Sequence, residues 1–340
     1  MLKTNTLLHN ISLKPYNTFG IEVVASQFME IDSNSVLQEV LFSEEYPTPL
    51  LIGGGSNILL TKDISTLVIH LNTKGIEVIS KTENHTLVKV QAGEVWHEFV
   101  CWAIDHDMGG IENLSLIPGN VGTAPIQNIG AYGVELKDVF VSCQALDLKE
   151  KKEVTFKKED CNFGYRDSVF KRNKGRYIIT TVTFELTTKN HNKNITYGAI
   201  ESQLNQKCID DPSIRQISDA VISIRKSKLP DPKVLGNGGS FFKNPVISME
   251  EFNALQKKYP DIPYYAFGED HQKIPAGWLI ERCGYKGKRF EEVGVHENQA
   301  LVLVNYGNAK GEQIWQLAQN IQKSVQDKFN VYIEPEVNIY

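Results

Sequence analysis

The sequence predicts a mixed α+β fold assembled from successive α/β units. Apolar runs of strand length, such as TPLLIGGGSNILL and STLVIHL, alternate with a polar, helix-like segment between Tyr16 and Leu71. Two glycine-rich stretches, GGGSN and IPGNVGTAPIQNIGAYG, occur in this part and in the next. After Ala220 the composition changes again, and predicted helices surround a turn that contains Ser240. These three observations indicate a globular protein with more than one domain.

Length and composition support a chain with a large core. With 340 residues, 41% hydrophobic and 23% charged, the chain is long enough for two or three domains. The formal net charge is −5, and Lys and Arg are dispersed, which argues against a nucleic-acid groove or a membrane-surface patch. No apolar run approaches the roughly 18 residues of a spanning helix, and the first residues do not resemble a signal peptide. We therefore expect a cytoplasmic protein.

The cysteines and histidines predict no metal site. The cysteines are widely spaced and form no CxxC pair, which favours reduced, structural thiols over disulfides or zinc ligands. They are Cys101, Cys143, Cys161, Cys208 and Cys283. His97, His106 and His296 lack HxxxH or HExxH spacing, so each is expected to be a surface or packing residue.

Local patterns predict the order of the elements. In the first unit the apolar runs predict buried strands, and SNSVLQEVLFSEE predicts a helix. TLVKVQAG then predicts a strand, and EVWHEFVCWAIDHDMGGIENL predicts an amphipathic helix because its apolar residues recur at helical spacing. Beyond the second glycine-rich stretch, VFVSCQALDL, KEVTF and RYIITTVTFELTT predict strands, with a turn in KKEDCNFGYRDS. A linker is expected near Asp210 to Ser218.

The remaining elements follow from Ala220 onward. A helix is predicted to end before Leu229 and Pro230, and the turn around Ser240 comes next. MEEFNALQKKYP, AGWLIERCG and GEQIWQLAQNIQKSVQDKFN predict helices, with a strand in ALVLVN between the last two. The chain closes on a predicted strand in VYIEPEVNIY.

The glycine-rich stretches are candidate cofactor loops, because glycine turns let backbone amides approach pyrophosphate oxygens. GGGSN (Gly53 to Asn57) follows an apolar run but lacks both GxGxxG and GxxxxGK[ST], which disfavours a Rossmann site or a Walker NTPase. Taken alone, it is equally compatible with a tight turn. IPGNVGTAPIQNIGAYG (Ile117 to Gly133) places four glycines in one long connection, as expected of a chain wrapped around a ligand. Two such loops favour one extended cofactor.

Ser240 is the first candidate catalytic residue. The segment from Leu229 to Pro245 sets it in a glycine-lined turn and flanks it with Lys228, Lys243 and Asn244. A nucleophilic serine would need a GxSxG elbow and a histidine base, and GGSFF offers neither. Proton donation and helix capping both remain open from the sequence.

Arg166 and Glu336 are weaker candidates. Arg166 in GYRDS occupies a predicted turn, where its guanidinium would either bind a carboxylate in bidentate fashion or form a structural ion pair. Glu336 in EPEV lies beside a proline on the terminal strand, a position where a carboxylate is usually solvated.

Seven motifs, in order along nearly the whole chain, together resemble one known family. They are NTFGI, GGGSN, ENLSLIPGNVGTAPIQNIGAYGVE, FGYRDS, GNGGSFFKNP, AGWLIE and EPEV. The sequence is similar to the UDP-N-acetylenolpyruvoylglucosamine reductase (MurB) family of bacterial cell-wall synthesis. NITYGAIESQL, with Tyr197, resembles the tyrosine-bearing loop of the type I members.

This resemblance implies the domain organisation. It implies an FAD-binding module of the vanillyl-alcohol-oxidase (PCMH) type in two α/β subdomains, followed by a C-terminal α/β substrate-binding domain. We expect residues 1–72 and 329–340 to form the first FAD-binding subdomain, 73–219 the second, and 220–328 the substrate-binding domain. The terminal strand would then return to the first subdomain.

The resemblance also implies a reaction in two halves. NADPH reduces FAD, and hydride then passes to the enolpyruvyl methylene carbon of UDP-N-acetylglucosamine enolpyruvate, which yields UDP-N-acetylmuramate for peptidoglycan synthesis. By matching positions, Ser240 would protonate the alpha carbon, and Arg166 and Glu336 would polarise the substrate carboxylate. NADPH is expected to use the sugar pocket, so it leaves no motif of its own.

Binding residues follow by the same matching of positions. The expected FAD-binding residues are Gly53, Gly54, Gly55, Ser56, Asn57, Ile117, Pro118, Gly119, Gly122, Ile129 and Gly130. The expected substrate-binding residues are Tyr197, Arg225, Lys228, Asn244, Tyr265, Lys286 and Gln299. Lysine, arginine and amides suit a diphosphate, and tyrosine suits a uracil or sugar face. We expect a monomer without nucleic-acid, membrane or metal partners.

Two alternative functions remain open at this point. A flavoenzyme of the same fold that oxidises an alcohol or hydroxy acid would share the glycine loops but would not need Ser240, Arg166 and Glu336 around a carboxylate. A non-enzymatic nucleotide-sugar binding protein would use the glycine loops only as turns and would bind no flavin.

Overall fold

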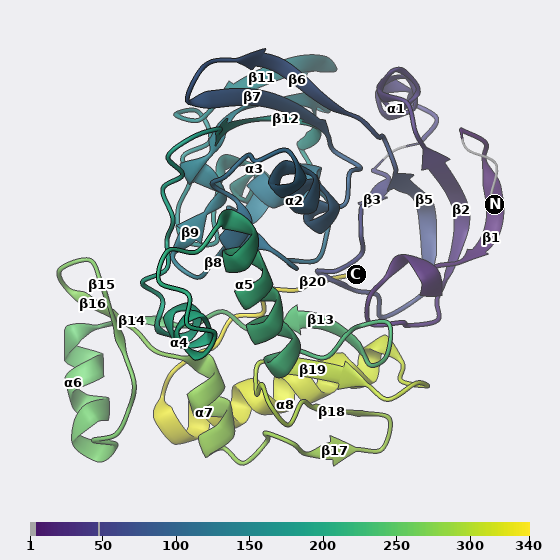
Figure 1. Ribbon diagram of the computed structural model, residues 1–340. Coiled ribbons are helices and arrows are strands. Elements are labelled where there is room, and N and C mark those ends of the chain that lie inside the picture. Colours follow the sequence, from purple (N-terminus) through teal and green to yellow (C-terminus); the bar gives the residue numbers. More distant parts are fainter. Residues whose placement is uncertain (1–4, 47) are drawn as a thin grey trace. The chain divides into compact units, whose positions relative to one another are not determined.

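The computed structural model describes residues 5–46 and 48–340, which form two compact units (Figure 1). The first unit comprises the chain up to Ile11, Ala25–Gly54 and Ile64–Lys226, and the second comprises Ser12–Val24, Gly55–Asp63 and Ser227–Tyr340. Both units contain helices and sheets, so the α+β class is confirmed. The three-part division into domains stays a prediction.

The first unit begins with a four-stranded sheet in the order β1-β2-β5-β3. Its strands are β1 (Leu8–Ser12), β2 (Val24–Ile31), β3 (Leu50–Ile52) and β5 (Ile64–Leu71). β2 and β3 each pair in parallel with β5, and helix α1 (Asn34–Phe42) connects β2 to β3. Leu37 and Leu41 of α1 are buried in one cluster with Met29 and Leu67 of the strands. The alternation of apolar and polar segments thus produces a βαβ unit.

The second sheet of this unit has five antiparallel strands in the order β11-β10-β12-β7-β6. They are β6 (Ile76–Lys81), β7 (His85–Gln91), β10 (Phe140–Asp147), β11 (Lys152–Lys157) and β12 (Tyr177–Thr187). Helix α2 (Trp96–Asp105) packs on it through Trp96 and Phe99, whose ring centroids lie 6.0 and 5.0 Å from that of Phe184. The helical spacing of these apolar residues is what the sequence predicted for α2.

A long connection between α2 and β10 carries the second glycine-rich stretch. It contains the 3-10 helices η2 (Glu112–Leu114), η3 (Val121–Gln127) and η4 (Leu136–Asp138), and a hairpin of β8 (Gly130–Ala131) with β9 (Val134–Glu135). Helix α3 (Val169–Arg172) lies between β11 and β12, and α4 (Gly198–Gln206) and α5 (Ile214–Lys228) follow β12.

The linker expected near Asp210 to Ser218 is wrong over its second half. Helix α5 begins at Ile214, and its buried residues include Ile214, Ile217 and Val221. These positions follow the i, i+3, i+7 spacing of an amphipathic helix. The apolar face therefore makes a helix of a stretch that its polar residues suggested was a linker.

The second unit contains a four-stranded sheet in the order β13-β19-β18-β17 and a three-stranded sheet in the order β14-β16-β15. Their strands are β13 (Gly236–Ser240), β14 (Val246–Ser248), β15 (Tyr265–Phe267), β16 (His271–Lys273), β17 (Arg289–Phe290), β18 (Val293–Val295) and β19 (Val302–Asn305). Helices α6 (Met249–Lys258), α7 (Ala276–Arg282) and α8 (Gly311–Phe329) lie where the sequence predicted them. Helix α8 buries one face that includes Ile314, Ile321 and Val325.

The chain's last strand is shorter than predicted. Within VYIEPEVNIY only β20 (Asn338–Ile339) is a named strand, and it pairs in parallel with β4 (Ile58–Leu59). Pro335 makes an isolated bridge to Phe242, since proline has no amide with which to continue a ladder. The 3-10 helix η1 (Lys14–Tyr16) belongs to the same unit.

Across residues 5–46 and 48–340, no helix has the length and apolar character needed to cross a membrane. The same residues hold no cluster of three or more His, Cys, Asp or Glu side chains arranged to bind a metal ion. All five cysteines are free thiols.

Gly55 tests how tightly the GGGSN segment is packed. Its φ is +60°, and a Cβ built on it would lie 2.0 Å from the Tyr16 carbonyl oxygen. Gly175 has a φ of +81° but no atom within 4 Å of its built Cβ. We predict that Gly175→Ala lowers the free energy of unfolding by about 1–2 kcal/mol. Gly55→Ala should lower it by at least about 3 kcal/mol, because the added methyl group also clashes with the backbone.

The measurement is the midpoint of urea unfolding for each variant. Gly175→Ala is the matched control for the left-handed conformation alone. Equal losses in the two variants would show that the contact with Tyr16 does not constrain this segment.

Candidate active site

The first two glycines of GGGSN lie against the second glycine-rich stretch. A Cβ on Gly54 would lie 2.7 Å from Asn120 Oδ1 and 3.1 Å from the Gly119 Cα, and a Cβ on Gly53 would lie 3.5 Å from Asn120 and Thr123. Only glycine permits this approach at Gly54. The two loops that the sequence singled out separately therefore meet in the first unit.

The second stretch is fixed by strand-like hydrogen bonds to the turn before α2. The Trp96 amide donates to the Gly119 carbonyl at 2.9 Å, and the Gly122 amide donates to the Ala92 carbonyl at 2.9 Å. The buried Asn120 side chain adds a 2.9 Å bond from Nδ2 to the Gly93 carbonyl. A Cβ on Gly122 would come within 2.5 Å of the Ala92 Cβ. Hydrogen bonds and close packing within the first unit therefore hold the loop in place.

Open backbone amides remain where the two loops meet. Among residues 5–46 and 48–340, the amides of Gly54, Gly119 and Asn120 have no hydrogen-bond acceptor. Asn120 is buried, whereas Gly119 is partly exposed and Gly54 is exposed. Adjacent open amides form concavities that bind anions. These residues therefore fit the pyrophosphate of an extended dinucleotide such as FAD.

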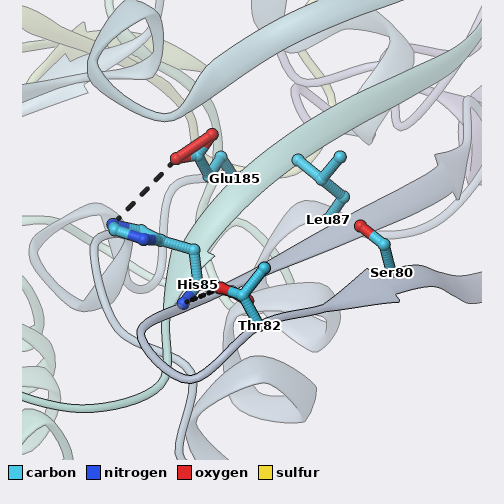
Figure 2. Close-up of a pocket in the computed structure, with 5 residues that line it drawn as sticks. All are labelled: Ser80, Thr82, His85, Leu87 and Glu185. Atoms are coloured by element: carbon cyan, nitrogen blue, oxygen red, sulfur yellow. Dashed lines mark hydrogen bonds and ion pairs between the residues drawn. The ribbon is translucent and has the colours of Figure 1, made fainter.

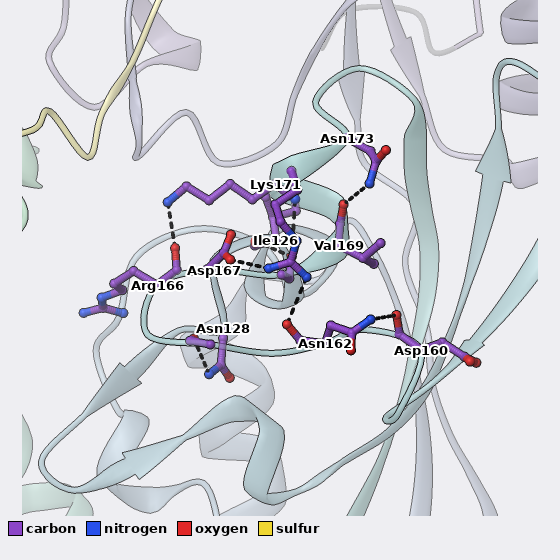
Figure 3. Close-up of polar contacts among 12 residues, drawn as sticks. Ile126, Asn128, Asp160, Asn162, Arg166, Asp167, Val169, Lys171 and Asn173 are labelled. Carbon is purple, nitrogen blue, oxygen red and sulfur yellow. Dashed lines mark hydrogen bonds and ion pairs between the residues drawn. The ribbon is translucent and has the colours of Figure 1, made fainter. Parts of the chain in front are cut away.

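Arg166 lies in a tightly bonded turn that is joined to the same loop (Figure 3). The Asn128 side chain donates to the Gly164 carbonyl at 3.2 Å, and the Ser168 hydroxyl donates to the Ile126 carbonyl at 2.6 Å. Asn128 itself has a left-handed φ of 43°. Two side chains thus connect the turn to the glycine-rich loop.

The conformation of Arg166 is strained, with a φ of 53°. Lys171 Nζ, from α3, donates to the Arg166 carbonyl at 2.8 Å. This bond holds the backbone of Arg166 in place. The Arg166 guanidinium donates to the Gly130 carbonyl at 3.1 Å. Arg172 and Asp167 form an ion pair beside it. A non-glycine residue held in this region by several bonds is typical of a functional site.

Arg225 on α5 brings a second guanidinium into the first unit. Its Nε donates to the Leu116 carbonyl at 3.2 Å, and it also bonds the Tyr132 side chain. Burial lowers the pKa of Arg225, and the positive charge of Arg166 lowers this pKa further, while Tyr132 raises it. No ion pair to Arg225 occurs in the part of the chain that the structure describes. A partly buried cation without a counter-ion is expected to face an anionic ligand.

Tyr132 connects Arg225 to Tyr197. The two tyrosine rings meet edge to face with centroids 5.3 Å apart, and burial raises the pKa of Tyr132. The side chain of Asn113 joins the two segments because its Nδ2 donates to the Tyr132 carbonyl at 3.1 Å and to the Asn194 carbonyl at 2.8 Å. Tyr197 itself is half exposed. The structure thus brings together two of the residues that the resemblance assigned to substrate.

Ser240 ends β13 at a β-bulge. Asn237 pairs with Val304 and Ser240 with Val302, so β13 holds one extra residue in this interval. Gly239, with a φ of +70° and open space around its built Cβ, supplies the bulge conformation. Within the described chain the exposed Ser240 hydroxyl makes no hydrogen bond. The bulge therefore presents the serine to solvent or to a ligand.

The surroundings of the serine are rigid. The buried Asn237 side chain donates to the Leu235 carbonyl at 2.8 Å and accepts from the Gly239 amide at 3.0 Å. Phe241 and Phe242, which follow Ser240, are fully buried. Proton donation is favoured over capping, because Ser240 ends a strand rather than beginning a helix.

Glu336 lies on the chain segment beside Ser240. Its amide donates to the Phe241 carbonyl at 2.7 Å, and its carbonyl accepts from Asn57 Nδ2 at 3.2 Å. The Asn338 amide returns a bond to the Asn57 carbonyl at 3.0 Å. In the second unit, backbone and side-chain hydrogen bonds therefore connect the segment after Ser240 to Glu336, and Glu336 to Asn57.

The other residues assigned to substrate lie in the second unit. Asn244 Oδ1 accepts from the Ala276 amide at 2.9 Å, and Gln299 Oε1 would lie 3.3 Å from a Cβ on Gly277, so both gather at the start of α7. Tyr265 is exposed on β15, with Lys273 Nζ 6.0 Å from its ring centroid. Lys286 pairs with Glu281 at 3.1 Å, and Lys228 is exposed at the end of α5.

The sequence reasoning did not find Asn113, Tyr132 or Asn128. Each acts through one or two bonds to residues distant in the chain, such as the 81-residue separation between Asn113 and Asn194. No periodic pattern marks such contacts. The only local signal is the run of small and amide residues on either side of Tyr132.

A pocket on β6, β7 and β12 of the first unit contains none of the predicted site residues (Figure 2). Its volume is about 210 Å³, and it is lined by Ser80, Thr82, His85, Leu87 and Glu185 from the ends of β6, β7 and β12. His85 and Glu185 lie 4.0 Å apart across it. None of the predicted site residues belongs to these strands.

Known proteins similar to this chain identify its family. Residues 231–340 match the C-terminal domain of UDP-N-acetylenolpyruvoylglucosamine reductase, and residues 32–153 match an FAD-binding domain. The UDP-N-acetylenolpyruvoylglucosamine reductase of Flavobacterium johnsoniae is 52% identical, with 97% of this chain and 98% of that protein covered. The Pseudomonas fluorescens (strain Pf0-1) protein of that name is 49% identical over the same shares. A crystal structure of the Thermus caldophilus enzyme has a TM-score of 0.67 at 22% identity, covers 98% of both chains, and supports the fold.

The fold and the matched domains define an FAD-binding oxidoreductase. The chain belongs to the UDP-N-acetylenolpyruvoylglucosamine reductase family. The family resemblance expected from the sequence is confirmed, whereas the assignment to type I stays a prediction.

Ser168 tests the connection between the Arg166 turn and the glycine-rich loop. Its hydroxyl both bonds the Ile126 carbonyl and caps α3. Ser248 caps α6 in the same way but bonds no such loop. We predict that alanine at either serine lowers stability by about 1 kcal/mol, and that only Ser168→Ala slows substrate reduction, by about tenfold or more.

Thermal unfolding of both variants measures the loss of stability, and steady-state kinetics measure the rate of substrate reduction. An equal effect of the two substitutions on turnover would contradict the positioning role of Ser168.

Proposed function

We propose that this protein catalyses the NADPH-dependent reduction of UDP-N-acetylglucosamine enolpyruvate to UDP-N-acetylmuramate, with FAD as cofactor. Family membership over 97% of the chain and the FAD-binding domain match support this proposal. The reaction belongs to peptidoglycan precursor synthesis, which places the protein in the cytoplasm. A monomer that binds neither nucleic acid nor membrane suffices for it.

The two glycine-rich stretches hold the cofactor in this proposal. The open amides of Gly54, Gly119 and Asn120 would bind the pyrophosphate, and the strand-like bonds to the turn before α2 would keep them in place. The proposed FAD contacts are Gly53, Gly54, Gly55, Ser56, Asn57, Ile117, Pro118, Gly119, Gly122, Ile129 and Gly130. When bound, FAD carries hydride from NADPH to the enolpyruvyl double bond.

The observation that carries the substrate assignment is the partly buried Arg225, which bonds Tyr132 and the Leu116 carbonyl but forms no ion pair among the described residues. A substrate with a diphosphate and a carboxylate supplies the negative charge that this guanidinium lacks within the chain. Tyr197 offers a half-exposed ring for a uracil or sugar face. Lys228, Asn244, Tyr265, Lys286 and Gln299 are the further contacts that we assign to the UDP-sugar.

Ser240 is the proposed proton donor. A serine hydroxyl is a weak acid, so it serves only when the acceptor is strongly basic and the geometry is fixed. The bulge and the buried Phe241 and Phe242 fix its backbone, and no bond within the described chain occupies its hydroxyl. Hydride addition to the methylene carbon leaves a negative charge on the alpha carbon and its carboxylate, and Ser240 Oγ–H protonates that carbon.

Arg166 and Glu336 are assigned to the substrate carboxylate. Arg166 stabilises the charge that spreads onto the carboxylate oxygens as the enolate forms. Glu336, held at its amide and at its carbonyl, supports the enol form. We also propose that residues 1–72 with 329–340, residues 73–219 and residues 220–328 act as the two FAD-binding subdomains and the substrate-binding domain.

Ser240→Ala separates the two half-reactions. We predict that NADPH still bleaches the flavin at close to the wild-type rate, while reoxidation by the enolpyruvyl substrate slows by about 10²–10⁴-fold because protonation is lost. Stopped-flow absorbance under anaerobic conditions measures both rates.

Ser248→Ala, which removes the cap of α6 and none of the residues assigned to the site, is the control. Near-wild-type reoxidation in Ser240→Ala would remove the serine from the chemistry. Reoxidation by a simple alcohol-derived carbonyl compound instead of the sugar would favour the alcohol-oxidising alternative.

Arg225 tests the anion assignment. We predict that Arg225→Ala raises the substrate KM by about 10–100-fold, since a charge-assisted bond is lost, and that Arg225→Lys recovers only part of it because the forked donor geometry is missing. Arg215→Ala is the matched control, because Arg215 lies on the same helix as Arg225 and forms an exposed ion pair with Asp105 of α2. An unchanged KM in Arg225→Ala would contradict the assignment.

A further inference from the structure

His97 contacts the backbone at the entrance to the glycine-rich loop. It lies in the first turn of α2, and its Nδ1 accepts a hydrogen bond from the Leu116 amide at 3.0 Å. The Leu116 carbonyl accepts from Arg225 Nε at 3.2 Å. Leu116 is therefore held at both its amide and its carbonyl, directly before Ile117 and Pro118.

The backbone conformation of Leu116 requires these two hydrogen bonds. Its φ is 58°, in the left-handed region that a leucine avoids. A residue stays in this region only when its surroundings over-determine it. The turn at Leu116 aims the chain toward Gly119, whose amide is one of the open donors at the junction of the two loops.

The bond from Leu116 requires a neutral imidazole. Nδ1 accepts only when it carries no proton, so the ring's single proton resides on Nε2. The surroundings favour this state, because burial lowers the pKa of His97 and the charges of Arg225 and Lys226 on α5 lower it further. Glu98 on the same helix opposes them by raising this pKa. The Cys101 sulfur, 3.9 Å from Nδ1 and 3.8 Å from Nε2, remains a thiol because burial raises its pKa.

We propose that neutral His97 is a positioning residue for the cofactor: by accepting the Leu116 amide it holds the strained turn that presets the loop from Ile117 to Gly130 for FAD. This inference rests on the proposed function, because it takes the loop's ligand to be FAD. His97 touches neither the cofactor nor the substrate in this role.

The pH dependence has a definite sign. The folded-state pKa of His97 lies below its ordinary value of about 6.5. The contribution of the Leu116 bond is therefore complete above about pH 6.5 and is lost as the pH falls through the lower, folded pKa. Protonation puts a second donor opposite the Leu116 amide, so the turn relaxes and FAD affinity falls.

The test is equilibrium FAD binding to the full-length apoprotein, followed by flavin fluorescence at about pH 8 and about pH 5.5. His97→Asn keeps an acceptor that does not titrate, and His97→Phe removes the acceptor. His106→Asn is the matched control, since His106 lies at the other end of α2 and its Nδ1 contacts only the Trp102 carbonyl among the described residues.

We expect wild type and His106→Asn to bind FAD tightly at the higher pH and more weakly at the lower, because protonation of His97 removes the acceptor of the Leu116 amide. His97→Asn should bind within about threefold of wild type at the higher pH and lose the pH dependence. His97→Phe should bind about tenfold more weakly at both values. Amide hydrogen exchange at Leu116 should accelerate in His97→Phe and not in His97→Asn.

Two results would overturn the inference. One is a His97→Phe protein with wild-type affinity, and the other is a His97→Asn protein that keeps the wild-type pH dependence. If His97→Phe does not fold, the comparison of His97→Asn with wild type still decides. Failure of wild type to bind FAD at either pH would instead count against the proposed function, so the two failures are distinguishable.

Discussion

The bonding of the long loop after α2 to the turn before α2 is the constraint on which the candidate site depends. Backbone bonds at Trp96 and Gly122, with the Asn120 side chain between them, fix the loop as though it were a strand. The fit leaves no room for a Cβ at Gly122 and little at Gly54. Because the loop is fixed, its open amides are preorganised for an anion, and the Arg166 turn has a firm surface to which Asn128 and Ser168 attach it.

Backbone strain collects around this loop. Leu116, Asn128, Tyr132 and Arg166 all have positive φ, although none is glycine. Each is held by bonds to distant residues, as Leu116 is by His97 and Arg225. The free energy of those bonds offsets the strain. The same bonds place Arg166 against the Gly130 carbonyl and Arg225 beside Tyr132, whose ring packs on that of Tyr197. In the second unit, a bulge and the buried Phe241 and Phe242 fix the backbone of Ser240 and leave its side chain exposed.

The sequence predicted those parts of the fold that have a repeating cause. Helices α2, α6 and α8 each bury one face, so their apolar periodicity predicts them. Ile214 and Ile217 of α5 are buried in the same way, but the polar residues around them favour a linker in the sequence. The glycine motifs indicated two ligand loops but not that Gly54 meets Gly119, because that contact depends on tertiary packing. The roles of Ser240, Arg166 and Glu336 came from the family resemblance and remain proposals, and His97, predicted to be a surface or packing residue, holds a strained turn through one bond.

The most direct test of the proposed reaction is an anaerobic absorption spectrum of the wild-type protein, recorded through successive additions of NADPH and UDP-N-acetylglucosamine enolpyruvate. We predict flavin absorbance that bleaches with NADPH and returns only with the enolpyruvyl sugar. Flavin that bleaches but does not respond to that sugar would contradict the proposed substrate. A protein that binds no flavin even when FAD is supplied would contradict the interpretation of both glycine-rich loops.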